Sequence, residues 1–379
     1  MKYLIINVNN TNKHNIKKIF PVNLFFMYNY LSRDNDVKLI DLNCEKFESN
    51  DSDAIIIFAP FKSKKNVNEL LKKINNKNSI YIFGEDSIYF RDKYKNAQKL
   101  YESINFEKTS QFYDCDISKY YMFDNKNTIY LTTSIGCIGK CDFCVHRDSM
   151  FKKIDYTTII EDLNKYTTRY DVQHVVFLDN TMLVDIKYDM KIFEFLMNKN
   201  ITFSFSTRSD ILIKNEQYIP MIKELGCLSI ELGVESGSQK RLDYFNKHIT
   251  IEQNEKAISL IRENRIKLLL DFIMFDPMTT IEDLKKDMEF LKKNGLYGYY
   301  PNVIQNEYIY YKSLNNSSHY SDEILNIKNK FNKYNKKIEK QREKENNGTK
   351  IIKLNLLPYL YFEKLINDDR IFNERSFNG

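Results

Sequence analysis

The chain has 379 residues, 42% hydrophobic and 28% charged, which fits a folded protein with hydrophobic cores and suggests two or three domains. Its formal net charge of +6 is small for this length, so charge alone does not point to a nucleic acid as partner. The apolar run in the N-terminal MKYLIINVNNTNK is too short for a secretory signal and no stretch approaches a membrane span, so we expect a cytoplasmic protein with reduced cysteines.

The first part of the chain alternates short apolar runs with helical patterns. Strands are expected at residues 3–8, 36–43, 53–61 and 79–87, and helices at 21–31 and 67–74. This alternation predicts an α/β fold that begins with a Rossmann-like, doubly wound parallel sheet. Ligands of such sheets bind at the C-terminal ends of the strands. Residues 91–127 are polar and aromatic with weak periodicity, and we interpret them as a linker that ends a first domain of residues 1–125.

The alternation restarts at Thr128 and continues through the middle of the chain. Strands are expected near 129–134, 173–178, 201–206, 228–234, 267–275 and 299–303, and helices at 157–169, 187–199, 215–225, 251–264 and 280–294. Repeated strand–helix units predict a partial (β/α)6 barrel of the TIM type over residues 126–303. Such barrels carry their chemistry on loops at the C-terminal ends of the strands.

A helical C-terminal region is predicted for residues 304–379. Ile324, Ile327, Phe331, Tyr334 and Ile338 recur at spacings of three and four, which indicates one buried face of a helix. Docking of this helix on the barrel is favoured over binding of a partner or nucleic acid, because acidic residues interrupt its lysines. The stretch LPYLYF at 357–362 is expected in a core. Six tyrosines after the sixth strand either line a substrate cavity or pack together: Tyr297, Tyr299, Tyr300, Tyr308, Tyr310 and Tyr311.

Three of the six cysteines lie in the stretch CIGKCDFC, at Cys137, Cys141 and Cys144, directly after the first barrel strand. A structural zinc site needs four closed ligands, and His146 could supply the fourth. An iron–sulfur cluster is favoured, because three thiolates leave one iron open for a small molecule. Gly136 and Gly139 would let the loop curl around such a cluster. The remaining cysteines are expected to be small buried hydrophobic residues: Cys44, Cys115 and Cys227.

The pattern Cys-x3-Cys-x2-Cys, with an aromatic residue before the last cysteine, resembles the radical SAM superfamily. The resemblance implies that Cys137, Cys141 and Cys144 bind a [4Fe-4S] cluster beside Phe143. It further implies that S-adenosylmethionine (SAM) chelates the open iron through its amino and carboxylate groups. The reduced cluster would cleave SAM to a 5′-deoxyadenosyl radical that abstracts hydrogen from a substrate.

Three further stretches resemble barrel segments of this superfamily. The resemblance implies that HVVFLDNTML (174–183) turns Asp179 and Asn180 towards the cofactor, although Asp and Asn also serve as helix N-caps. In FSTRSDIL (205–212) it implies that Arg208 meets the SAM carboxylate, which suits the guanidinium fork. In LSIELGVESGSQKRLDYFNKHIT (228–250) it implies contacts of Glu235 and Ser236 with the amino group or ribose of SAM. The stretch LLLDFIMFDPMTTIEDL (268–284) is read as mainly structural, with Thr280 and Asp283 capping the next helix.

The resemblance extends upstream to the cobalamin-binding domain that precedes the barrel in the B12-binding radical SAM subfamily. It is carried by residues 19–43 and 81–90, and it implies that a corrin could sit against the first domain. The chain has no Asp-x-His-x-x-Gly motif, and Phe83-Gly84-Glu85 stands where the subfamily has Gly-Gly. We therefore interpret the first domain as a degenerate cobalamin-binding fold, and both outcomes, binding and no binding, stay open.

Two functional hypotheses follow. The first is a radical SAM enzyme that takes electrons from a reductant such as flavodoxin or ferredoxin and acts on a small molecule or peptide. Bound cobalamin would favour methyl transfer to carbon, and its absence would favour rearrangement, cyclisation or dehydrogenation. The second is a zinc-stabilised binding protein that uses the same cysteines with His146. No membrane span or nucleic acid enters either hypothesis.

Overall fold

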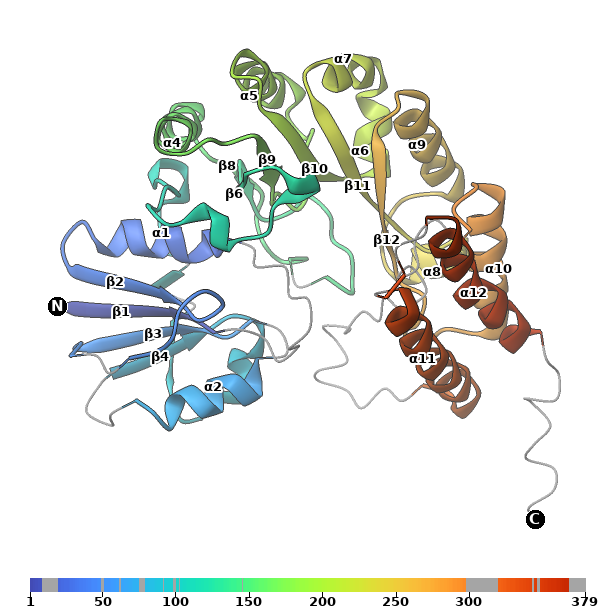
Figure 1. Cartoon of the computed structure of the whole chain (residues 1–379), viewed down its shortest axis with the longest axis horizontal. Helices are drawn as coiled ribbons and strands as arrows, with labels where there is room; N and C mark the ends of the chain where they lie inside the picture. Colours follow the sequence, from blue (N-terminus) through green and yellow to red (C-terminus); the bar gives the residue numbers. More distant parts are fainter. Residues whose placement is uncertain are drawn as a thin grey trace. The chain divides into compact units, whose positions relative to one another are not determined.

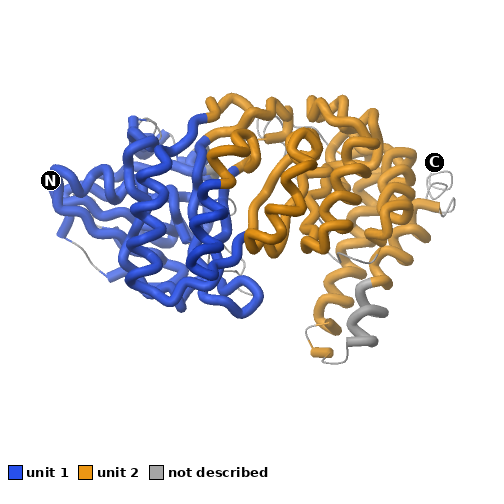
Figure 2. The backbone as a smooth tube through the Cα atoms, turned by 90° about the horizontal axis from the view of Figure 1, so that it is seen from above, with its two compact units in different colours: residues 1–135, 152–179, 191–203 blue, residues 136–151, 180–190, 204–379 orange. Residues whose placement is uncertain are grey.

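The computed structural model describes residues 1–8, 20–48, 51–60, 63–74, 79–90, 92–97, 100–101, 103–144, 146–297, 320–342, 344–345 and 348–367. The chain divides into two compact units (Figure 2). The first unit comprises residues 1–135, 152–179 and 191–203, and the second comprises 136–151, 180–190 and 204–379. Within the described ranges, every helix is too short or too polar to cross a membrane.

A five-stranded sheet opens the first unit, in the order β2-β1-β3-β4-β5. Its strands are β1 (Lys2–Asn7), β2 (Asp36–Asp41), β3 (Ala54–Phe58), β4 (Ser79–Phe83) and β5 (Lys95–Asn96), and neighbouring strands pair in parallel. Figure 1 shows α1 (Val22–Leu31) and α2 (Lys64–Leu71) on opposite faces of this sheet. This is the doubly wound arrangement that the apolar runs predicted.

The strands form a sheet because successive apolar side chains point to opposite faces and are buried on both of them. Ile6 and Ile57 belong to one buried cluster with Val67 and Leu70 of α2, while the alternate strand residues face away from α2. Parallel strands covered on both sides tend to be apolar throughout, as the central strand β3, AIIIF, is. A doubly wound sheet in this order binds ligands where the order reverses, here between β1 and β3. The segments after those strands, 9–19 and 61–62, lie outside the described residues.

The segment 91–127 contains more structure than a linker. The short strand β5 lies within it, and it continues with the 3-10 turns η2 (Phe106–Lys108), η3 (Ile117–Lys119) and η4 (Phe123–Asn125). The sequence did not predict β5, because a strand of two residues carries no periodicity. The carboxylate of Asp162 on α4 (Tyr156–Arg169) accepts a hydrogen bond from the backbone N–H of Gln111 at 2.7 Å. The backbone N–H of Tyr113 also donates to the Tyr166 hydroxyl of α4, so residues 111–113 pack on this helix within the first unit.

The second sheet has the order β12-β11-β10-β9-β6 (Figure 1). Its strands are β6 (Thr128–Leu131), β9 (His174–Phe177), β10 (Thr202–Arg208), β11 (Cys227–Glu235) and β12 (Lys267–Phe272). β6 pairs with β9, and β11 with β12, in parallel. All five agree with predicted strands, whereas the sixth, at 299–303, lies outside the described residues. A small antiparallel hairpin, β7 (Ser134–Ile135) with β8 (Lys152–Lys153), brackets the cysteine stretch.

Helices separate these strands largely as predicted. They are α4, α5 (Ile186–Asn198), α6 (Ser209–Lys214), α7 (Ile219–Glu224), α8 (Gln239–Tyr244), α9 (Ile251–Glu263) and α10 (Ile281–Lys293), with the 3-10 turn η5 (Glu216–Tyr218) before α7. The predicted helix 215–225 is thus divided into η5 and α7, and the six-residue helices α6 and α8 were not predicted. Thr280 and Asp283 form the predicted capping box of α10.

The C-terminal region contributes α11 (Asp322–Arg342) and α12 (Gly348–Ile366). Four residues of the predicted seam are buried on α11, namely Ile324, Ile327, Phe331 and Ile338, whereas the fifth, Tyr334, is half-buried and stacks on Tyr361. Tyr359 and Phe362 of the LPYLYF stretch are fully buried, which confirms the prediction that the stretch belongs to a core.

Tyr297 packs against the C-terminal helix α12. Its hydroxyl donates to Glu363 at 3.0 Å, and its ring lies 4.9 Å from that of Tyr359. The other five tyrosines of the predicted group fall outside the described residues: Tyr299, Tyr300, Tyr308, Tyr310 and Tyr311. Among the dispersed cysteines, Cys227 is buried as expected, whereas Cys44 and Cys115 are only half-buried.

Candidate iron–sulfur site

The cysteine loop begins at Gly136, immediately after β7. Gly136 has φ +78°, and a Cβ there would lie 2.1 Å from the backbone oxygen of Met150. Only glycine fits that position, which agrees with the expected role of Gly136 in curling the loop. The side-chain amide of Asn180 donates to the Gly136 carbonyl at 3.0 Å. Asn180 therefore supports the start of the loop.

Each of the three cysteine sulfurs lies beside a polar hydrogen. Cys137 Sγ accepts from the backbone N–H of Gly139 at 3.3 Å and lies 3.4 Å from the Thr181 hydroxyl. Cys144 Sγ accepts from the backbone N–H of His146 at 3.4 Å. Burial raises the pKa of the Cys144 thiol, and the other two cysteines raise it further. Donors of this kind stabilise negative charge on sulfur, which is what a cluster-bound thiolate carries.

Arg208 brings a positive charge to the third sulfur. It ends β10, and its Nη1 donates to Cys141 Sγ at 3.5 Å. Nη2 donates to the carbonyl of Lys247 at 2.8 Å, and Nε to Asp210 at 3.0 Å. A Cβ on Gly139 would lie 2.8 Å from Arg208 Nη1, so glycine is needed there to admit the guanidinium. The expected backbone curl is thus not the main requirement at Gly139.

The far side of the loop rests on the segment after α8. Phe143 is buried and packs edge-on against Phe245, with ring centroids 5.4 Å apart. The backbone N–H of Asp142 donates to the Phe245 carbonyl at 2.9 Å. Cys141, Phe143, Phe245 and Ile273 form one buried cluster, against which Cys144 packs. Aromatic and backbone contacts together therefore fix the orientation of the loop.

Glu235 lies at the end of β11 with a left-handed backbone, φ +67°, beside a register shift in the pairing with β12. Its carboxylate binds the Lys247 ammonium at 2.8 Å, and both side chains are at least 93% removed from solvent. A Cβ on Gly233 would lie 3.0 Å from both charged groups. A left-handed glutamate costs backbone energy, which proteins tolerate mainly at functional sites.

Lys247 was not singled out from the sequence, although the motif around Asn246 and Lys247 was. Its ammonium lies 5.9 Å from the centroid of the Phe143 ring, so it adjoins the cysteine loop. Asp271 of β12 also interacts electrostatically with this lysine, and Glu231 of β11 lies beside Asp271. Loss of hydration raises the pKa of Asp271 on β12 well above its ordinary value, and the Glu231 and Glu235 carboxylates raise it further.

Two predicted residues have their polar groups occupied elsewhere. The Asp179 carboxylate is buried and accepts from the backbone N–H of Thr133 at 2.9 Å and from its hydroxyl at 2.8 Å, so it holds the chain after β6. α5 begins at Ile186, so Asp179 is not its N-cap. The Ser236 hydroxyl is fully buried and donates to Asp287 at 2.6 Å.

The structure thus gathers most of the predicted site in the second unit. Cys137, Cys141, Cys144, Phe143 and Arg208 are linked directly or through one residue, and Glu235 joins them through Lys247. Within the described part of the chain, no three His, Cys, Asp or Glu side chains converge as the ligands of one metal ion would. A [4Fe-4S] cluster needs no such convergence, because each thiolate binds a different iron. Three thiols on one loop are thus compatible with such a cluster.

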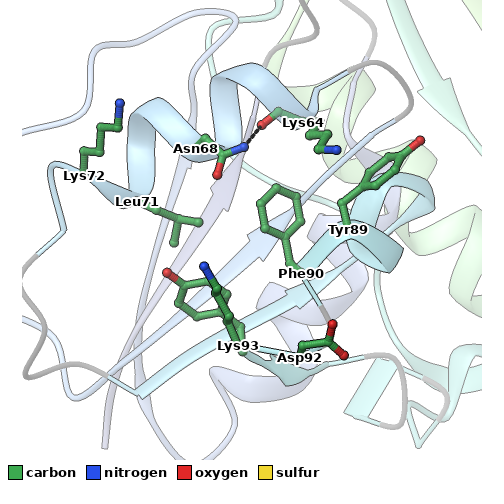
Figure 3. Close-up of a pocket in the computed structure, with 9 residues that line it drawn as sticks. Lys64, Asn68, Leu71, Lys72, Tyr89, Phe90, Asp92 and Lys93 are labelled. Atoms are coloured by element: carbon green, nitrogen blue, oxygen red, sulfur yellow. Dashed lines mark hydrogen bonds between the residues drawn. The ribbon is translucent and has the colours of Figure 1, made fainter.

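The first unit carries a pocket of about 330 Å³ between α2 and the chain after β4 (Figure 3). Its lining includes Lys64, Asn68 and Tyr89, together with aromatic and basic side chains from residues 90–94. The Lys64 ammonium lies 4.0 Å from the centroid of the Tyr89 ring. No cysteine or histidine lines this pocket, so it offers no ligand for a cluster.

Comparison with known proteins finds a family model and relatives that match part of the chain. The Radical SAM superfamily model matches residues 131–291. The anaerobic magnesium-protoporphyrin IX monomethyl ester cyclase of Rubrivivax gelatinosus is 26% identical over 168 residues, 43% of this chain and 30% of that protein. An uncharacterized methyltransferase of Pyrococcus horikoshii is 27% identical over 164 residues, 42% of this chain and 36% of that protein. The chain thus spans about a third of the length of the curated relatives it matches.

Among solved structures, the cobalamin-dependent SAM radical enzyme OxsB, with aqua-cobalamin and SAM bound, aligns with a TM-score of 0.59 at 16% identity. The alignment covers 98% of this chain and 56% of that one. The chain therefore carries a radical SAM domain, the domain of enzymes that use SAM and a [4Fe-4S] cluster. In fold, it resembles the cobalamin-dependent radical SAM enzymes, as the sequence predicted.

Proposed function

We propose that Cys137, Cys141 and Cys144 bind a [4Fe-4S] cluster whose fourth iron is completed by SAM. The observation that carries this proposal is the loop itself. Three thiols lie on one curled segment inside the matched domain, each beside a polar hydrogen, and Arg208 donates to the middle one. When bound and reduced, the cluster supplies reductive cleavage of SAM to a 5′-deoxyadenosyl radical. The zinc-binding hypothesis has less support, because no single-ion ligand group is found among the described residues.

The surrounding residues would bind and orient the cofactor. Arg208 carries a guanidinium suited to the SAM carboxylate, and its bonds to Asp210 and the Lys247 carbonyl hold it in place. Glu235 offers a carboxylate for the SAM amino group or ribose. Phe143 and Asn180 would fix the loop at its two ends, while Asp179 and Ser236 would hold the adjoining backbone segments.

The test is anaerobic purification and iron–sulfur reconstitution, followed by assay of 5′-deoxyadenosine after reduction with dithionite. The proposal expects a brown protein with about four irons and four sulfides that forms 5′-deoxyadenosine. Cys141→Ala should abolish SAM cleavage, while Cys227→Ala, which alters a thiol buried in β11, should retain it. A Cys141→Ala variant with full cleavage, or a colourless wild-type protein that holds zinc, would refute the proposal.

A cobalamin-dependent reaction is the second proposal, and it concerns residues 1–125. It is supported by the strand order of the first sheet and by the likeness in fold to cobalamin-bound OxsB over nearly the whole chain. Methyl transfer to carbon would then be the reaction. Titration with hydroxocobalamin tests it: a bound corrin band supports methyl transfer, and no band favours rearrangement, cyclisation or dehydrogenation.

The remaining assignments complete the proposal. Residues 126–303 would form the radical SAM barrel and 304–379 a helical region that covers it. The electron donor would be a flavodoxin or ferredoxin, and the substrate a small molecule or peptide. Assay with a purified flavodoxin and its reductase in place of dithionite would test the donor.

A further inference from the structure

We infer that Arg241 is a positioning residue that holds both the cysteine loop and Glu235 in place, an inference that rests on the proposed SAM-cleaving function. Arg241 lies on α8 and is only 3% exposed. Its Nη1 donates to Asp287 on α10 at 2.5 Å, and Nη2 donates to Asp276 at 2.6 Å. The same Nη2 donates to the backbone carbonyl of Ile273 at 2.7 Å. One guanidinium therefore joins α8 to two other segments of the second unit, the chain after β12 and α10.

Burying this group of charges costs free energy, so a contribution to stability does not explain why it is present. Two carboxylates and a guanidinium must all lose their water, and an apolar replacement is often as stable. The network fixes the relative positions of its members, because the planar guanidinium donates hydrogen bonds only to partners in a narrow set of positions. Asp287 extends that geometry, since it also accepts from the Ser236 hydroxyl and the Gly237 N–H, each at 2.6 Å. The turn that follows Glu235 is thus anchored through Arg241.

A second connection runs from Arg241 to the cysteine loop. The guanidinium carbon lies 5.2 Å from the centroid of the Phe245 ring. Phe245 in turn packs on Phe143, and its carbonyl accepts from the Asp142 N–H. Both residues of the loop lie between Cys141 and Cys144. Any shift of Phe245 would therefore move the part of the loop that carries these two cysteines.

A third connection runs from Arg241 to Glu235. Ile273, whose carbonyl accepts from Arg241, donates its own N–H to the Glu235 carbonyl at 2.8 Å. Glu235 has the left-handed backbone noted above, so it needs outside support to stay there. Arg241 thus braces the backbone at both ends of the proposed SAM site without touching a sulfur.

The experiment compares Arg241→Lys and Phe245→Leu with wild type in the full, reconstituted chain. Arg241→Lys keeps the charge but loses the fork. Phe245→Leu leaves the ion pairs intact, so it remains informative if Arg241→Lys fails to fold. Arg262→Met is the matched control, because Arg262 also donates to backbone carbonyls, at Asn294 and Gly295 after α10. The readouts are iron content, kcat and KM for SAM cleavage, and the electron paramagnetic resonance spectrum of the reduced cluster with and without SAM.

Both variants should keep the iron content of wild type, lose about 10- to 100-fold in kcat/KM for SAM cleavage, and show a weaker SAM-induced spectral change. Arg262→Met should match wild type. Wild-type kcat/KM and spectra in the two variants would overturn the inference while leaving the proposed function intact. Absence of 5′-deoxyadenosine from wild type itself would overturn the proposed function, and the inference with it.

Discussion

Arg208 Nη1 donates to Cys141 Sγ at 3.5 Å, and it does so across the position where Gly139 lacks a side chain. The arginine ends β10 and the cysteine lies in the loop after β7, 67 residues apart in the chain. A permanently charged guanidinium beside a thiolate stabilises the negative charge of that sulfur. The hydrogen bond therefore connects Arg208, which is expected to bind the SAM carboxylate, with Cys141, which is expected to bind the cluster.

Gly139→Ala tests this relationship. Its Cβ would lie 2.8 Å from Arg208 Nη1 and 3.4 Å from Cys137 Sγ, so the pinned guanidinium must shift. We expect the KM for SAM to rise about 10-fold, the size of one lost charge-assisted hydrogen bond, with iron content largely kept. Gly139→Ala combined with Arg208→Lys should be little worse than Arg208→Lys alone, because both act on one contact. Fully additive effects would show that the alanine acts elsewhere.

Gly295→Ala is the control for that variant. Its Cβ would also face an arginine, 3.3 Å from Arg262 Nη1, but at the end of α10. Because Gly295 has φ +60°, the alanine should cost about 1 kcal/mol of stability. The KM for SAM should stay at its wild-type value.

Because Glu235 and Lys247 form a buried salt bridge, we expect their substitutions to have strongly non-additive effects on the free energy of unfolding. Both are nearly free of solvent contact, so Glu235→Gln removes the salt-bridge partner of a buried ammonium and should cost about 3–5 kcal/mol in stability. Lys247→Met added to Glu235→Gln should recover much of that loss, because the unpaired charge is gone. A double-mutant cycle of urea unfolding measures the coupling, and additive losses would contradict it.

His174 predicts a pH dependence of stability in the first unit. Burial, together with the nearby Lys126 ammonium, lowers the pKa of His174 to about 3. The unfolded chain has a pKa near 6.5 and takes up a proton that the folded chain refuses, so stability is full above pH 6.5 and falls towards pH 3. At pH 5.5 the loss should be about 1.4 kcal/mol.

Urea unfolding between pH 7.5 and 5.5 measures this dependence. His174→Gln should keep a bond to the Thr202 hydroxyl, which lies 2.9 Å from the ring Nδ1, and should remove most of the slope. A slope that persists in His174→Gln would assign the dependence to other groups.

The variant His146→Ala distinguishes the iron–sulfur hypothesis from the zinc-binding hypothesis. His146 reaches Cys144 Sγ through its backbone N–H, which alanine keeps. We expect the variant to retain the brown colour, the iron content and SAM cleavage of wild type. Loss of bound metal from this variant would favour the zinc-binding hypothesis.

Much of the fold was predictable because its signals are local. Apolar runs marked the four long strands of the first sheet and five strands of the second, and the three-four seam marked α11. The strand β5 and the six-residue helices α6 and α8 were missed, since such short elements show no period. They form because the neighbouring sheet and helices hold them.

The sequence by itself determined the class of protein and the chemistry of the donor set. Three cysteines at spacings of four and three sit on one short loop, and chain connectivity alone keeps them together. Only the tertiary structure decided which polar residues surround them. Ser236 bonds to Asp287 and Asp179 to Thr133, while Lys247 binds Glu235 and Arg241 braces the site from α8. These partners lie 12 to 51 residues apart, and burial forces each polar group to find one, so only the packed chain can select it.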